Sequence, residues 1–151
     1  MKNILFICTG NTCRSPMAES IFRLRAGNKN SWKVRSAGLS AHIGMPASLE
    51  ARIVTSELGA DLSRHSSQLL TAEIVDQADL ILVMTESHRE HLQNTFPEVA
   101  HRVYLINELG TSKVHDICDP FGGSLEIYKQ TRDEIEQAVL ELILFLRLGE
   151  P

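Results

Sequence analysis

The first sixteen residues of this 151-residue chain constrain its fold more than any other stretch. Residues 2–7 (KNILFI) form a short apolar run rich in branched and aromatic side chains, which predicts a buried β-strand. Ser15 and Pro16 predict the start of a helix, with Ser15 as the N-cap and the proline at the first helical position. Because a glycine-containing loop between strand and helix gathers N–H groups at the positive helix end, we expect an anion-binding loop here.

Two side chains of this loop have the chemistry that phosphoryl transfer requires. The N–H dipoles, the helix end and Arg14 all favour the thiolate of Cys8, which is its nucleophilic form. Arg14 can bind two oxygens of a tetrahedral anion at once, which a lysine cannot do. The structural alternative is a glycine-containing turn with two idle cysteines. The residues predicted to bind the phosphate are Thr9, Gly10, Asn11, Thr12, Cys13 and Arg14.

A cysteine phosphatase also needs a group that protonates the leaving atom and later takes a proton from the attacking water. Asp119 is our candidate for this general acid and base. Pro120 fixes the backbone after it and favours an extended conformation at Asp119, as suits a residue held over a pocket. An Asp-Pro pair alone is only a turn signal. Asp116 is the second candidate, with a role as a loop residue as its alternative.

The segment from Cys8 to Glu19 (CTGNTCRSPMAE) resembles the signature of the low-molecular-weight protein-tyrosine-phosphatase family. Asp119-Pro120 matches the second motif of that family, and residues 35–38 (RSAG) extend the similarity along the chain. The resemblance implies a cysteine nucleophile and no cofactor. It also implies a four-stranded parallel sheet, in the order 2-1-3-4 and flanked by helices, with the phosphate-binding loop after the first strand.

The resemblance further implies a set of residues that keep the loop rigid. It ties the Asn11 side chain to Ser15, Ser36 and His65, and it makes Ser15 a donor to the Cys8 sulfur. From the residues themselves, Asn11 is suited to the left-handed backbone angles that an anion-binding loop needs. N-capping of the helix is the simpler role for Ser15, and the two roles are compatible.

Cys13 is a candidate redox partner of Cys8. The loop curls back on itself, so the two sulfurs can come within disulfide distance. An ionised nucleophile beside a second thiol is typical of reversible oxidation to a disulfide. The alternative is that Cys13 is only a small buried residue, and we expect Cys118 to be a loop residue.

Thr12 and Phe121 bear on the choice of substrate. Tyrosine-selective members of the family usually carry an aliphatic residue at the Thr12 position and aromatic residues after the Asp-Pro pair. Thr12 and the run 119–124 (DPFGGS) resemble instead the bacterial protein arginine phosphatases of the family. A threonine hydroxyl can accept from the N–H donors of phosphoarginine, and Phe121 can stack on its guanidinium. We therefore expect arginine-phosphorylated proteins as substrates, with tyrosine-phosphorylated proteins as the alternative.

Three other functions fit the sequence less well. Thiol-dependent arsenate reductases share the loop and fold but need two neighbouring cysteines beyond the third strand. Residues 84–98 contain none, and Cys118 stands alone. A protein that only binds phosphate needs neither Cys8 nor Asp119. A cysteine-phosphorylated carrier needs a lasting intermediate, which Asp119 works against by activating water.

Composition sets the remaining limits. With 43% hydrophobic residues, the chain predicts one globular domain over residues 1–151. A net charge of −4 argues against nucleic acid, and the longest apolar stretch, 138–148, contains two charges and is too short to cross a membrane. Three cysteines without a secretion signal argue against a disulfide scaffold. We expect a cytoplasmic monomer.

The histidines do not predict a metal site. His88 and His91 are three apart on a predicted polar helix, and His115 precedes Asp116. Neither pair has a third ligand at suitable spacing, and a cysteine nucleophile needs no metal. We therefore expect surface histidines and no bound metal.

Hydrophobic spacing predicts alternating strands and helices along the whole chain. Such alternation is typical of an α/β domain with right-handed crossovers and a site at the carboxyl ends of the strands. In the last helix, Leu125 and Tyr128 belong to the face predicted to point inward. The predicted strands are 2–7, 32–38, 80–84 and 102–106, and the predicted helices are 16–27, 46–59, 71–76, 85–94 and 124–148.

Overall fold

A computed structural model describes residues 2–27 and 31–149 of the chain. Within these residues, four strands form one parallel sheet in the order β2-β1-β3-β4. The predicted α/β class, the parallel sheet and the order 2-1-3-4 are therefore confirmed. The elements in chain order are β1 Lys2–Cys8, α1 Arg14–Ala26, β2 Trp32–Gly38, α2 Leu49–Ser56, α3 Ala72–Gln77, β3 Leu80–Val83, α4 Glu86–Thr95, the 3₁₀ helix η1 Pro97–Arg102, β4 Val103–Leu105 and α5 Leu125–Leu148.

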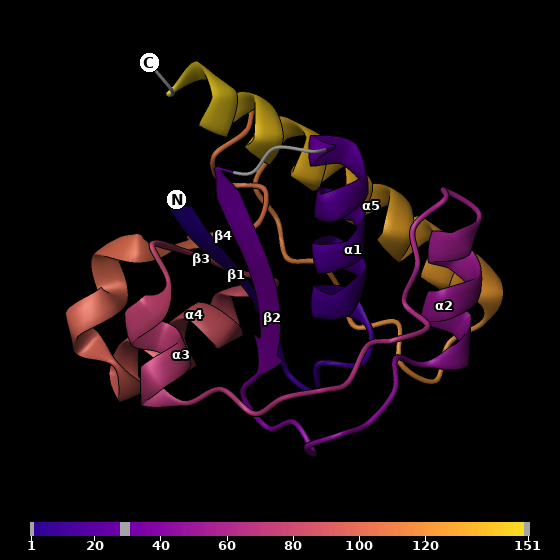
Figure 1. Cartoon of the computed structure of the whole chain (residues 1–151), viewed down its shortest axis with the longest axis horizontal. Helices are drawn as coiled ribbons and strands as arrows, with labels where there is room; N and C mark the ends of the chain where they lie inside the picture. The colour runs from indigo at the N-terminus through magenta and orange to yellow at the C-terminus, as the bar shows by residue number, and fades with distance from the viewer. Residues whose placement is uncertain (1, 28–30, 150–151) are drawn as a thin grey trace.

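Helices cover both faces of the sheet (Figure 1). Helices α1, α2 and α5 lie on one face, and α3 and α4 lie on the other (Figure 1). Strand β1 contributes to both cores, because successive side chains of a strand point to opposite faces. Ile4 and Phe6 pack in the core under α1 and α5, whereas Leu5 and Ile7 pack in the core under α3 and α4. This burial on both sides explains the continuous apolar run of the first strand.

The loop of residues 9–13 joins the end of β1 to the start of α1 and lies at the carboxyl edge of the sheet. Gly38, the last residue of β2, lies directly against it. A Cβ atom at Gly38 would come within 2.6 Å of the Thr9 carbonyl oxygen and 3.0 Å of the Asn11 nitrogen. The missing side chain therefore lets the end of β2 approach the β1–α1 loop.

Two helices begin two or more residues away from their predicted starts. Helix α1 begins at Arg14, with Cys13 at the N-cap, so Pro16 is its third residue and Ser15 is not its cap. The Ser15 hydroxyl bonds to Cys8 and Asn11 instead. Helix α2 begins at Leu49 rather than at residue 46, because its cap is the Ser48 hydroxyl, which accepts from the Ala51 N–H.

The C-terminal half differs from the prediction at two more points. The 3₁₀ helix η1 has no counterpart among the predicted elements, and it delays the start of β4 to Val103. Leu125 does not face the core as predicted: it is the first residue of α5 and 42% exposed, whereas Tyr128 is buried. Among the described residues, none of the helices combines the length and the apolar character needed to span a bilayer.

Candidate active site

Cys8 is buried at the carboxyl end of β1, and two donors approach its sulfur. The Asn11 backbone N–H donates to Sγ at 3.3 Å, and the Ser15 Oγ lies 2.9 Å from it. When Cys8 is a thiolate, Ser15 must be the donor in the second contact, since the sulfur then carries no hydrogen. Both contacts stabilise negative charge on the sulfur.

Arg14 is buried at the start of α1 and is held from the segment that follows β4. Its Nη1 donates to the Ile117 carbonyl oxygen at 2.8 Å, and its Nη2 lies 3.7 Å from the Asp119 Oδ2. A guanidinium fixed at one nitrogen keeps its plane, so its other N–H groups stay available to oxygens of a bound anion. The fold therefore joins Arg14 and Asp119, which are far apart in the sequence.

These groups surround one cavity of about 180 Å³. Its volume suits a phosphoryl group and the adjoining atoms of a side chain. The backbone N–H groups of Gly10, Thr12 and Cys13 make no hydrogen bond within residues 2–27 and 31–149. They remain available to an anion. The residues that line the cavity are Cys8, Thr9, Gly10, Thr12, Cys13, Arg14, Asp119 and Phe121.

The two aspartates considered for proton transfer differ in position. Asp119 lines the cavity and its side chain is 51% exposed, while its Oδ1 accepts from the Phe121 N–H at 3.0 Å. Asp116 is absent from the cavity lining, and its Oδ1 accepts from the Glu86 N–H at the first turn of α4. The geometry therefore favours Asp119 as the group that can reach a leaving atom.

Asn11 is the residue through which the loop is braced. Its backbone has a left-handed φ of 55°, as predicted for this position, and its side chain is fully buried. Its Nδ2 donates to Ser15 Oγ at 2.8 Å and to Ser36 Oγ at 2.9 Å, and its Oδ1 accepts from the Gln68 N–H at 2.9 Å.

The expected contact of His65 with the Asn11 side chain was wrong in one detail. His65 Nε2 lies 2.7 Å from the backbone carbonyl oxygen of Asn11, not from its amide. Both hydrogens of the amide nitrogen are used by Ser15 and Ser36, and the amide oxygen accepts from Gln68. His65 thus braces the same loop residue through the main chain.

Cys13 is a buried residue of the cavity wall, and its sulfur contacts the Ser48 cap of α2 and a tyrosine of α5. Its sulfur lies 3.3 Å from the Tyr128 hydroxyl and 3.5 Å from the Ser48 hydroxyl. Burial and the contact with Cys13 raise the pKa of the Tyr128 phenol, so this hydroxyl keeps its proton. Cys8 and Cys13 are both free thiols, and their oxidation to a disulfide stays a prediction.

Thr12 and Phe121 occupy the wall and the mouth of the cavity. Thr12 is half-buried, whereas Phe121 is 75% exposed. Ser48 N–H donates to the Thr12 carbonyl oxygen at 2.9 Å, which fixes the backbone of this wall to the start of α2.

His88 was expected on the surface, and this was wrong. It is only 6% exposed, and its Nε2 lies 2.9 Å from the hydroxyl of Thr9. The missed signal was topological: His88 is in the first turn after β3, and β3 is the neighbour of β1. Side chains that follow neighbouring parallel strands meet at the same edge of a sheet.

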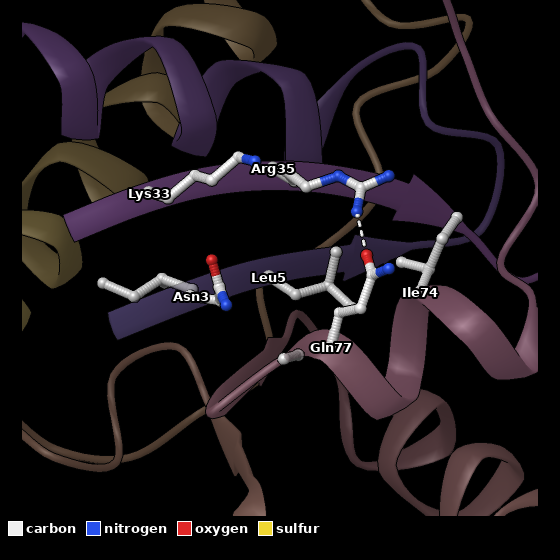
Figure 2. Close-up of a pocket in the computed structure, with 8 residues that line it drawn as sticks. Asn3, Leu5, Lys33, Arg35, Ile74 and Gln77 are labelled. Atoms are coloured by element: carbon white, nitrogen blue, oxygen red, sulfur yellow. Dashed lines mark hydrogen bonds between the residues drawn. The ribbon is translucent and has the colours of Figure 1, made fainter. Parts of the chain in front are cut away.

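A second cavity, of about 190 Å³, lies near the beginning of β1, between β1, β2 and α3 (Figure 2). Lys33 and Arg35 of β2 line it, and Arg35 Nη1 donates to Gln77 Oε1 at 2.9 Å. None of the predicted site residues lines it. Across the described part of the chain, no three histidine, cysteine or acidic side chains gather closely enough to hold a metal ion.

Comparison with known proteins adds a family to this geometry. The family model described as low molecular weight phosphotyrosine protein phosphatase matches residues 3–149. The protein-arginine-phosphatase of Bacillus subtilis (strain 168) is 42% identical over 141 residues, which are 93% of this chain and 93% of that protein.

Two solved structures are similar over nearly the whole chain. The YwlE arginine phosphatase from Geobacillus stearothermophilus superimposes with a TM-score of 0.92 at 36% identity, covering 98% of this chain and 94% of that one. A YwlE arginine phosphatase with serine in place of a cysteine has a TM-score of 0.92 at 40% identity, covering 98% and 97% of the two chains. Its active-site serine is phosphorylated.

Proposed function

Because the chain belongs to the low molecular weight phosphotyrosine protein phosphatase family, we propose that it hydrolyses phosphoarginine in proteins through a cysteinyl-phosphate. The observation that carries this proposal is the single cavity lined by Cys8, Arg14 and Asp119, with Thr12 and Phe121 at its wall and mouth. A thiol, a fixed guanidinium and a carboxyl group around one anion-sized space supply a nucleophile, an electrostatic clamp and a proton carrier.

In the first step, the Cys8 thiolate attacks phosphorus in line with the bond to the leaving nitrogen. The S–P bond forms, the P–N bond breaks, and the electron pair of that bond goes to nitrogen. Asp119 in its protonated form gives its proton to this nitrogen. The arginine side chain therefore does not have to leave as an anion. The N–H groups of the loop and the Arg14 guanidinium bind the three oxygens that carry the developing charge.

In the second step, water attacks the phosphorus of the cysteinyl-phosphate. Asp119, now ionised, takes a proton from this water as its oxygen bonds to phosphorus. The S–P bond breaks, and its electron pair returns to the Cys8 sulfur as a thiolate. Ser15 and the Asn11 N–H, which already contact this sulfur, stabilise the charge that returns to it. The phosphorylated serine in the related mutant supports an intermediate of this kind.

The choice of phosphoarginine rests on the cavity wall and on the relatives named protein-arginine-phosphatase. The guanidinium of phosphoarginine buries N–H donors beside the phosphorus, and the Thr12 hydroxyl can accept from one of them. An aliphatic residue at this position would leave a donor unpaired, at a cost of about 1–3 kcal/mol. Phe121 at the mouth can stack on the flat guanidinium.

The proposal also covers the cellular location of the enzyme and the number of chains that it needs. Catalysis requires the Cys8 thiol in reduced form, which favours the cytoplasm. One copy of the chain suffices, since the residues given a role all come from this chain.

The decisive experiment measures phosphate release from an arginine-phosphorylated protein and from a phosphotyrosine peptide, with Cys8→Ser as the control. We expect strong preference for phosphoarginine and no turnover by Cys8→Ser. Thr12→Ile should lower kcat/KM for phosphoarginine about 10- to 100-fold, the equivalent of roughly 1–3 kcal/mol, and raise it for phosphotyrosine. Preference of the unchanged protein for phosphotyrosine would keep the mechanism and refute the substrate; release from neither would refute both.

A further inference from the structure

His88 belongs to the edge of the sheet that carries the nucleophile, although it comes from another element. Thr85 caps α4, with its hydroxyl accepting from the His88 N–H at 3.1 Å, which fixes the first turn of the helix after β3. Because β3 pairs directly with β1, this turn lies beside the β1–α1 loop. The imidazole is buried there with 6% exposure.

The contact of His88 is with the residue next to the nucleophile. Its Nε2 lies 2.9 Å from the Thr9 Oγ1, and Thr9 lines the same cavity as Cys8 and Arg14. The backbone of Thr9 is held independently, since its carbonyl oxygen accepts from the Ser40 N–H at 2.9 Å. His88 therefore has no part in holding this main chain: it fixes the side chain of Thr9.

The surroundings of His88 keep its ring neutral. Burial and the positive charge of Arg14 lower its pKa from 6.5 to about 4. Asp116 and Asp119, which lie in the segment after β4, have the opposite effect and raise this pKa. His91, on the same helix as His88, lowers it slightly. At neutral pH the imidazole thus carries a single N–H.

The hydrogen bonds around the ring favour one place for that N–H. Within residues 2–27 and 31–149, the buried Nδ1 has no hydrogen-bond partner. A hydrogen on Nδ1 would be a buried donor without an acceptor, and such groups are rare and costly. A hydrogen on Nε2 is satisfied by Thr9 Oγ1. In this tautomer the Thr9 oxygen accepts, so the hydrogen of its own hydroxyl is free.

We propose that His88 is a positioning residue of the reaction: it donates from Nε2 to Thr9 Oγ1 and so directs the Thr9 hydroxyl hydrogen to a phosphoryl oxygen in the cavity. The proposal rests on the function proposed above and adds one side-chain donor to the loop N–H groups and Arg14. An aliphatic residue at position 88 would leave the Thr9 side chain free to rotate away from the bound oxygen.

A double-mutant cycle tests whether His88 acts through Thr9. Thr9→Val and His88→Ala should each lower kcat/KM for phosphoarginine about tenfold, below the roughly 10²–10³-fold loss typical of a direct main oxyanion donor. The double variant should lose no more than either single one. His88→Gln, whose amide can donate to the same oxygen, should recover most of the activity. His91→Ala, on the same helix but exposed, is the matched control and should equal the unchanged protein.

Binding of inorganic phosphate separates this proposal from the proposed function, because it involves no turnover. Thr9→Val and His88→Ala should weaken phosphate binding equally and again without additivity. Additive losses, or no loss in His88→Ala, would overturn the role of His88 even in an active phosphatase. An enzyme inactive on phosphoarginine that still shows the non-additive loss in phosphate binding would refute the proposed substrate and keep the positioning role.

Nitrogen NMR of the His88 ring needs no variant and therefore does not depend on whether His88→Ala folds. We expect a neutral ring at pH 7, with hydrogen on Nε2 and none on Nδ1. A ring protonated on Nδ1 would make Thr9 the donor to His88, leave no free hydroxyl hydrogen, and overturn the proposal.

Discussion

Two of the cavities among the described residues have nearly equal volumes, about 180 Å³ at the end of β1 and about 190 Å³ near its beginning, and both contain an arginine. They differ in how their donors are held. Arg14 is buried and bonded to a backbone carbonyl, whereas Arg35 is half-buried and bonded to the exposed side chain of Gln77 (Figure 2). Cation content therefore does not distinguish the two cavities.

The backbone distinguishes them. Near the beginning of β1, the main chains of Asn3 and Leu5 pair with Lys33 and Arg35 in the parallel ladder. In the β1–α1 loop the chain has left the ladder, and the N–H groups of Gly10, Thr12 and Cys13 remain available to a ligand. We infer that a phosphate site in this fold needs unpaired N–H groups and a fixed guanidinium, and that positive charge alone is not enough.

We expect the largest difference between the two cavities in kcat after each arginine is changed to lysine. Arg14→Lys loses bidentate binding and the bond to Ile117, so kcat should fall about 10²–10³-fold, or roughly 3–4 kcal/mol. Arg35→Lys keeps the charge where no anion reacts and should leave kcat unchanged. Steady-state kinetics on the same phosphorylated protein measures both. An equal loss in Arg35→Lys would mean that the second cavity takes part in the reaction.

Asparagine changes in the two regions should differ in stability. Asn11→Ala leaves buried groups of Ser15, Ser36 and Gln68 short of a partner and keeps a non-glycine residue at positive φ. We expect the free energy of unfolding to fall by about 2–3 kcal/mol.

Asn3→Ala is the matched control for that change. The variant keeps the backbone N–H of residue 3, which bonds to Asp79 at 2.7 Å, so its effect should stay within about 0.5 kcal/mol. Urea unfolding monitored by circular dichroism gives both values. Similar values for the two variants would show that the bracing of the loop adds little to the stability of the fold.

The sequence predicted the β1–α1 loop well because its information is local. A buried strand, a glycine, a cysteine and an arginine lie within fifteen residues, and strand-to-helix geometry brings them together without help from distant segments. The sheet order and the contacts of Asn11 with Ser15 and Ser36 were predicted from the family resemblance, not from spacing. The order is confirmed, and the two contacts are present in the structure.

Contacts that depend on packing between distant segments were predicted poorly. His88 was placed on the surface because helix spacing says nothing of the strand beside which the helix begins. Of the two roles expected for Ser15, the contacts with Cys8 and Asn11 are present, whereas the N-cap role was wrong because α1 begins at Arg14. The second cavity had no signal, since it results from how α3 packs beside β1 and β2. The chemistry of the loop was visible in the sequence, whereas its contacts with His88 and Gln68 were missed.

The smallest expected change is in stability, after removal of one side chain that contacts a lining residue of each cavity. Tyr128→Phe removes the hydroxyl that contacts Cys13 and Ser48 and should lower the free energy of unfolding by about 0.5–1.5 kcal/mol near neutral pH. Gln77→Ala removes the exposed partner of Arg35 and should change it by less than about 0.5 kcal/mol.

The role of Tyr128 can also be tested through the pH dependence of unfolding. Burial raises the pKa of Tyr128 in the folded state above its ordinary value of 10. The unfolded chain releases the phenolic proton first, so this contribution is complete below pH 10 and is lost as the pH rises above it. The free energy of unfolding should therefore fall more steeply between pH 9 and 11 for the unchanged protein than for Tyr128→Phe, as measured by denaturant titrations across that range. Parallel slopes would mean that the phenol ionises as easily in the folded protein as in water, and that Cys13 is not held by a protonated tyrosine.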